Sequence, residues 1–261
     1  MHQDPPEKET LAEATLISHL LELRTRLLRA TVAVCLVFLP LAFFSNELFT
    51  LIAQPLLEKL PEGTSLIATS VVSPFMAPLK LSIIAAVFIA MPYILFQVWG
   101  FVAPGLYRHE RRFALPLFLT SVVLFYVGVA FAYFIVFPLM FAFLTSTAPA
   151  GVRMMTDISS YLDFVVLLFF AFGIAFEMPV AVVLLAATGM VKVESLKKQR
   201  GYVLLGIFII AAVLTPPDAV SQTFMAVPMY ALFEIGIVLA QYLVRQRAAD
   251  KAQHETSPPV E

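Results

Sequence analysis

The chain has 261 residues, of which 60% are hydrophobic and only 13% are charged, with a formal net charge of -1. A mean hydropathy of +0.89 excludes an ordinary soluble domain and indicates a polytopic membrane protein. The single cysteine, Cys35, excludes disulfides and cysteine metal clusters, and the four histidines lie outside the apolar runs, so we expect no metal, haem or other cofactor.

Six apolar runs in chain order predict six transmembrane helices in an all-α fold. Their expected bounds are about 30–46, 75–99, 113–143, 161–188, 201–214 and 219–244. They form a membrane domain over residues 15–244, and the polar composition on either side predicts disordered tails over residues 1–14 and 245–261.

Prolines occur in or beside most of these runs, so we expect kinked and tilted helices around a concave face. The fifth and sixth helices are expected to be short. At ~1.5 Å per residue, the run 201–214 spans only ~21 Å, less than the ~30 Å hydrocarbon core of a bilayer.

The distribution of basic residues predicts the orientation of the helices. Fourteen of the 17 Lys and Arg residues lie in the two terminal segments and in the loops 108–112 and 192–200, all on one side of the predicted membrane domain. The positive-inside rule places that side, and therefore both termini, in the cytoplasm.

The segment before the first span, residues 15–29, has the period of an amphipathic helix. Glu22 and Arg26 share its polar face at the spacing of a local ion pair. Arg24 instead projects from the apolar face. It either snorkels at the membrane edge or pairs with an acid on another element, and we favour the second interpretation.

The loop after the second span places Glu110 among basic residues, with Arg111 and Arg112 directly behind it. An acid in a basic loop is either neutralised by its neighbours or available to a basic ligand. The two arginines either hold Glu110 in place or keep other basic peptides away.

Two acids, Glu177 and Glu234, fall inside predicted spans, where an unpaired charge is costly. Each is a structural acid bonded to a neighbouring helix, a group lining a polar cavity, or part of a proton relay. For Glu177 we favour the cavity, because Pro179 frees a backbone carbonyl beside it.

Several motifs resemble the TatC family, the polytopic receptor subunit of the twin-arginine protein translocase. They are HLLELRTR at 19–26, SPFMAPLK at 73–80, FVAPGLYRHERR at 101–112, FAYFIVFPL at 131–139, FGIAFEMPV at 172–180 and LTPPDAVSQ at 214–222. The likeness runs in order from about residue 15 to residue 242.

The resemblance implies a bacterial inner-membrane protein that binds twin-arginine signal peptides of folded cargo at its cytoplasmic face. The implied peptide site comprises Glu22, Phe101 and Glu110, and we add Arg24, Arg111 and Arg112 as its neighbours. Further implied positions are Glu177 as an intramembrane polar residue, Asp218 as a periplasmic acid, and Thr215 and Gln222 as docking residues for the single-span partners TatB and TatA. Other TatC copies and the lipid bilayer are the remaining expected partners, and nucleic acid is not one.

The residues themselves favour the same pair of acids. Two guanidinium groups require carboxylates, and the acids next to membrane helices on the cytoplasmic side are Glu22, Glu110 and Glu194. Three lysines around Glu194 are expected to neutralise it.

Two other classes compete with this interpretation. A proton- or ion-coupled transporter would use Glu177 and Glu234 as carriers, but no internal repeat is visible. An intramembrane hydrolase would need a catalytic constellation within the spans, and the sequence shows none, so we expect no enzyme activity.

Overall fold

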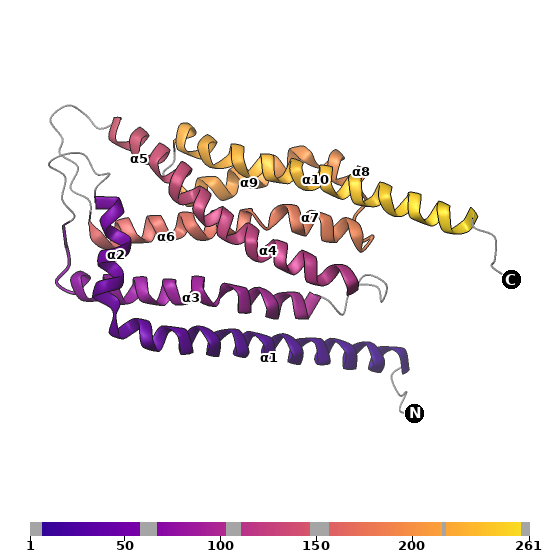
Figure 1. The fold of residues 1–261 in the computed structure, drawn as a ribbon, viewed down its shortest axis with the longest axis horizontal. Coiled ribbons are helices and arrows are strands. Elements are labelled where there is room, and N and C mark those ends of the chain that lie inside the picture. The colour runs from indigo at the N-terminus through magenta and orange to yellow at the C-terminus, as the bar shows by residue number, and fades with distance from the viewer. Residues whose placement is uncertain (1–6, 58–66, 103–110, 147–156, 216–217, 257–261) are drawn as a thin grey trace, which may run out of the picture. The chain divides into compact units, whose positions relative to one another are not determined.

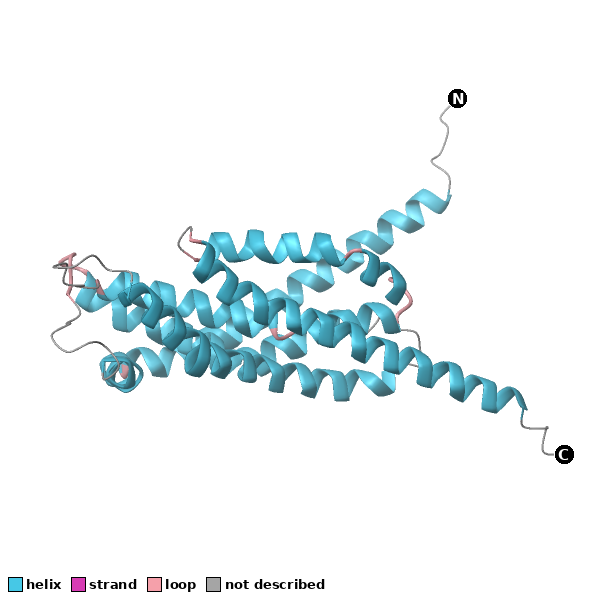
Figure 2. Cartoon of the chain, turned by 90° about the horizontal axis from the view of Figure 1, so that it is seen from above, coloured by secondary structure: helices cyan, strands magenta, loops and turns pink. Residues whose placement is uncertain are grey.

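The structure, a computed structural model, is all-helical in the residues that it describes (Figure 1). These are residues 7–57, 67–102, 111–146, 157–215 and 218–256. Within these ranges there is no strand (Figure 2), and one isolated bridge joins Ile67 to Asp157. The predicted all-α class is therefore confirmed. The chain forms two compact units, which we call the N-terminal unit (Met1–Pro61 with Ala68–Phe118) and the C-terminal unit (Glu62–Ile67 with Leu119–Glu261).

The N-terminal unit is built on two long helices that lie side by side, α1 (Glu7–Phe43) and α3 (Ser73–Val102) (Figure 1). The short helix α2 (Ser45–Leu57) lies between them in sequence, and the unit also takes in the first residues of α4 (Arg111–Phe131). Prolines inside α1 and α3 do not end these helices.

In its described residues, the C-terminal unit contains the rest of α4 and six further α-helices. They are α5 (Phe137–Ser146), α6 (Ile158–Ala175), α7 (Met178–Ala187), α8 (Val193–Lys198), α9 (Arg200–Leu214) and α10 (Ala219–Thr256). A π-helical turn, η3 (Ala132–Val136), joins α4 to α5 just before Pro138, and the N–H of Phe137 bonds to the carbonyl of Ala132. Pro138 has no N–H and cannot make the usual helical hydrogen bond. The wider π turn accommodates this missing bond without ending the helix.

Five helices in the described part of the chain are long and apolar enough to cross a membrane. They are Ile17–Phe43, Ser73–Phe101, Leu115–Phe143, Ile158–Ala187 (α6 with α7) and Ala219–Gln246. Each of these overlaps one of the six predicted spans, although the bounds differ. The predicted fifth span is α9, whose 15 residues reach ~22 Å, so the count of six crossings stays a prediction.

The structure differs from the sequence prediction at both ends. The expectation of a short sixth helix is wrong, because α10 has 38 residues and continues through Pro228. It extends to Thr256, through twelve residues that the composition had predicted to be disordered. At the other end α1 already begins at Glu7, and its apolar stretch begins at residue 17 and not at residue 30. Both extensions are rich in Ala, Glu, Lys, Arg and Gln, which lengthen an existing helix at little cost because no new nucleus is needed.

In the C-terminal unit, α7 and α10 approach each other closely at a glycine. A methyl group built on Gly236 would lie 2.9 Å from the Cα atom of Pro179 and 3.1 Å from the Cβ atom of Val182. Phe233 and Ile237, on the same helix as Gly236, are almost completely buried. This tight contact fixes α10 against the helix that follows Glu177.

Candidate functional site

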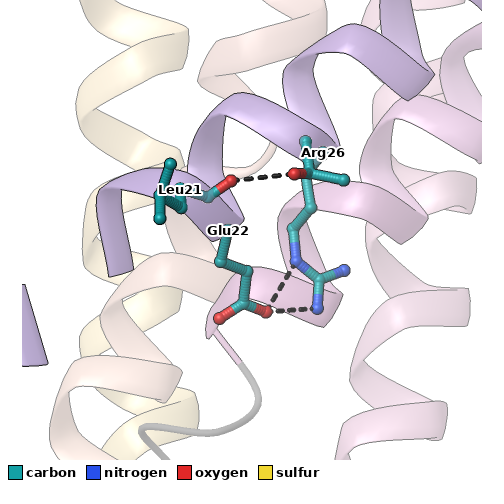
Figure 3. Close-up of polar contacts among 4 residues, drawn as sticks. Leu21, Glu22 and Arg26 are labelled. Atoms are coloured by element: carbon teal, nitrogen blue, oxygen red, sulfur yellow. Dashed lines mark hydrogen bonds and ion pairs between the residues drawn. The ribbon is translucent and has the colours of Figure 1, made fainter. Parts of the chain in front are cut away.

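The best-defined polar contact of the N-terminal unit is the ion pair between Glu22 and Arg26 on α1 (Figure 3). Two donors of the guanidinium, Nε and Nη2, converge on one carboxylate oxygen, Oε1, at 2.9 Å and 2.6 Å. The side chains are 36% and 22% exposed, respectively. A helical pair with this spacing and exposure stabilises a helix by only about 0.2–0.5 kcal/mol. The contact is therefore well oriented but weak.

Helix α3 provides the surface on which this pair rests. The guanidinium of Arg26 lies against Gly100, where a methyl group would overlap Nη1 and stand 3.0 Å from Cζ. Nearby, the ring of His19 stacks on Phe101 with centroids 4.2 Å apart and planes at 25°. Because Gly100 has no side chain, a bulky cation fits between the two helices. The structure thus brings the predicted residues Glu22 and Phe101 to the same α1–α3 seam.

Other members of the predicted peptide site are placed differently. Arg24 is exposed and not buried, and it has no partner among the described residues, which do not include Glu110, so its pairing with an acid on another element stays a prediction. Its side chain faces outward, as in the snorkelling interpretation. Glu110 lies outside the described residues. Arg111 and Arg112 begin α4, but their side chains also lie outside the described part of the chain.

Two features of this seam were not found from the sequence. One is the seat of Arg26 on Gly100, whose only signal was a glycine in an otherwise bulky helix. The other is Gln97, one turn before Gly100 on α3, which is 5% exposed and whose Oε1 atom has no hydrogen-bond partner in the described residues. Buried amide groups are usually bonded, so Gln97 is a polar position without a structural explanation within these residues.

Glu177 lies at the break between α6 and α7. Pro179 lies at the start of α7 and has no N–H to bond the carbonyl of Ala175. Separately, the N–H of Glu177 bonds to the carbonyl of Ile174 at 3.0 Å. The Glu177 side chain is hydrogen-bonded to Ser121, which is 1% exposed. Its Oε1 atom is buried and has no partner in the described residues. The carboxyl group is therefore bonded to Ser121, while its buried Oε1 atom has no hydrogen-bond partner among the described residues.

Glu234 behaves as a satisfied structural acid. Its Oε2 atom accepts a hydrogen bond from Arg200 at the start of α9, at 2.6 Å, and its Oε1 atom accepts one from Tyr230 at 2.9 Å. Both carboxylate oxygens are occupied. Of the three interpretations given to this residue, the tie to a neighbouring helix fits the contacts, and the pair joins α9 to α10.

The LTPPDAVSQ segment forms a set of local bonds at the junction of α9 and α10. Asp218 caps α10, because its Oδ1 atom accepts from the N–H groups of Val220 and Ser221 at 3.1 Å and 2.7 Å. The hydroxyl of the buried Thr215 donates to the Ala211 carbonyl at 2.8 Å. Gln222 donates from Nε2 to the carbonyl of Phe208 on α9 at 3.0 Å.

A metal site has no support in the described part of the chain, where no three His, Cys, Asp or Glu side chains gather in a way that could hold an ion.

Fold and site together first define a class: a multi-pass helical membrane protein with a carboxylate–guanidinium pair near one end of its first apolar helix. The sequence model of the family described as Sec-independent protein translocase protein (TatC) matches residues 18–228. The chain belongs to the TatC family. It is therefore a component of a protein translocase and not an enzyme.

Individual relatives agree with this assignment. The Sec-independent protein translocase protein TatC of Azotobacter chroococcum mcd 1 is 54% identical over 244 residues, which cover 94% of this chain and 95% of the relative. The TatC of Escherichia coli (strain K12) is 53% identical over 229 residues, covering 88% and 89%. A crystal structure of the twin-arginine translocase receptor TatC superposes with a TM-score of 0.77 at 38% identity, covering 86% of this chain and 98% of that chain.

Proposed function

We propose that this chain binds the twin-arginine signal peptides of folded cargo, and that Glu22 and Glu110 receive the two arginines. Phe101, Arg24, Arg111 and Arg112 border the same site. The observation that supports this proposal is the geometry of Glu22, whose carboxylate already binds a guanidinium through two converging donors. A side chain held in this way, and 36% exposed, is suited to receive a guanidinium from outside.

The site is proposed to face the cytoplasm of a bacterial cell, with the chain in the inner membrane and both termini cytoplasmic. The clustering of 14 of the 17 basic residues on one side supports this orientation. Family membership and the apolar helices support a multi-pass membrane location.

For assembly, we propose that single-span TatA-like and TatB-like subunits dock near Thr215 and Gln222, and that other TatC copies join the complex. Both residues lie at the α9–α10 junction, where α9 is too short to cover a full bilayer. Asp218 marks the proposed periplasmic end of α10. Glu177 lies at the break between α6 and α7 and has one carboxyl oxygen without a partner in the described residues. We propose that it faces the path that the signal peptide takes after it has bound.

The contacts of Glu234 weaken the alternative interpretation of the chain as a coupled transporter. Glu234 is bonded to Arg200 and Tyr230, so of these two acids only Glu177 keeps a carboxyl oxygen without a partner in the described residues.

Peptide binding to acid variants tests the proposed site. We expect Glu22→Ala and Glu110→Ala each to weaken binding of a twin-arginine peptide by about 1.5–3 kcal/mol, because each removes a charge-assisted contact. The binding constants are measured with a labelled peptide and the purified protein in lipid nanodiscs.

Glu194→Ala is the matched control. Glu194 is an exposed acid in the first turn of α8, and its loss removes the same charge without touching α1 or α3. An equal loss of affinity in all three variants would indicate general electrostatic attraction and contradict a defined site.

A further inference from the structure

We propose that Arg26 is a specificity-determining residue of the peptide site: it is an internal competitor that an incoming arginine displaces from Glu22. The inference rests on the proposed function and adds a reason why the site distinguishes an arginine ligand from a lysine ligand.

The carboxylate of Glu22 is already occupied within the chain. Both hydrogen bonds from Arg26 end on Oε1, and Glu22 has no further partner among the described residues (Figure 3). An arginine ligand that approaches both carboxylate oxygens side-on must therefore move Arg26 away from Oε1. The pair is also electrically neutral, so it attracts an arbitrary cation less than a free carboxylate does.

Displacement separates arginine from lysine. A ligand guanidinium reproduces the two converging bonds that Arg26 gives up, because the two groups are chemically identical. A lysine ammonium is a compact point charge without the planar fork of a guanidinium. Its contact with Glu22 would therefore be weaker than the Arg26 contact that it displaces. An internal guanidinium thus sets a threshold that a second guanidinium meets and an ammonium does not.

The weakness of the pair makes the exchange feasible. Glu22 and Arg26 are neighbours on one helix and are both partly exposed, so the contact is not a buried ion pair whose rupture would strand a charge. Arg26 is held in addition by its seat on Gly100, where a methyl group would overlap Nη1. The seat depends on the absence of a side chain at this single position of α3. Filling it should weaken the competitor without changing any charge.

The test compares two peptides that differ only in their paired residues, Arg-Arg or Lys-Lys, and measures their dissociation constants with the protein in nanodiscs. With the unchanged protein, the Arg-Arg peptide should bind more tightly. In Arg26→Gln the Lys-Lys peptide should gain affinity, so that the ratio of the two constants falls about tenfold. In Gly100→Ala the ratio should fall in the same direction by a smaller factor.

Two matched controls should leave the ratio unchanged. Arg29→Gln removes the same charge from α1 at an exposed arginine without a partner among the described residues. Gly206→Ala adds the same methyl group at a position where, apart from the adjacent backbone of its own helix, no atom lies within 4 Å of the new carbon.

The outcomes separate this inference from the function on which it rests. Equal binding of both peptides to the unchanged protein would overturn the proposed function. Normal discrimination there, with the same ratio in Arg26→Gln and in Gly100→Ala, would overturn the internal competitor alone. Loss of Arg-Arg binding in Arg26→Gln with unchanged thermal unfolding would also overturn it, because Arg26 would then be holding Glu22 in place. If Arg26→Gln does not fold, Gly100→Ala decides, since it keeps both partners of the pair.

Discussion

The α1–α3 seam of the N-terminal unit and the α7–α10 contact of the C-terminal unit hold their helices together in different ways. No residue of the apolar stretch Ile17–Phe43 in α1 is fully buried, and the contacts of α1 with α3, which runs alongside it, include Arg26 over Gly100 and His19 on Phe101. By contrast, α10 meets α7 through backbone that approaches closely at Gly236. Long polar side chains can change partners without moving the helices, whereas a close-packed backbone contact cannot. Of the predicted peptide residues, Glu22 and Phe101 lie on the α1–α3 seam, whose polar side chains can change partners.

The largest effect should come from filling the close contact. Gly236→Leu places a side chain where even a methyl carbon would lie 2.9 Å from Pro179, and overpacking of this kind costs about 1–3 kcal/mol. Thermal unfolding of the purified protein should show a clear decrease in Tm. The control, Gly206→Leu, adds the same side chain at a position with open space, and equal Tm values for the two variants would mean that the α7–α10 contact is not tight.

A medium effect is expected at the start of α10. Asp218→Ala removes the acceptor for two backbone N–H groups and should lower the free energy of unfolding by about 1 kcal/mol. Asp218→Asn keeps a capping oxygen and should recover most of this loss. Both are measured by thermal unfolding, and a similar loss in the two variants would show that the charge of Asp218, and not its cap, is what matters.

The smallest effect is expected where α9 is tied to α10. Glu234→Gln should cost less than about 1 kcal/mol, because Arg200 and Glu234 are 44% and 29% exposed and the amide oxygen still accepts from Tyr230. The change in Tm should shrink further at high salt, as for a screened pair. A salt-independent loss of several kcal/mol would place the pair among buried ones and would make the C-terminal unit rigid at this junction too.

The sequence was sufficient for the class and for most of the spans because long apolar runs constrain a membrane helix strongly. It failed at the helix ends. The polar residues 7–14 and 245–256 carry no apolar period, yet they continue helices that are already nucleated. Composition alone does not show whether a polar segment next to a helix forms a loop or continues that helix.

The candidate site was predicted in part. The spacing of Glu22 and Arg26 predicted their ion pair, because an i,i+4 pair depends only on the geometry of a single helix. Neither the seat on Gly100 nor the pairing of Arg200 with Glu234 follows a local rule, since each joins residues far apart in sequence. The surroundings of Arg24 also depend on other elements, because an arginine on an apolar stripe is buried only if another helix covers it.

The length of α10 has a practical consequence. Its 38 residues extend ~57 Å, while its apolar stretch ends near Gln246, so about ten residues continue as a helical arm of ~15 Å. A spectroscopic label on this arm would turn with the membrane-embedded part of the same helix. Its distance to a second label would therefore report the tilt of α10 during a transport cycle, without a modification inside the bilayer.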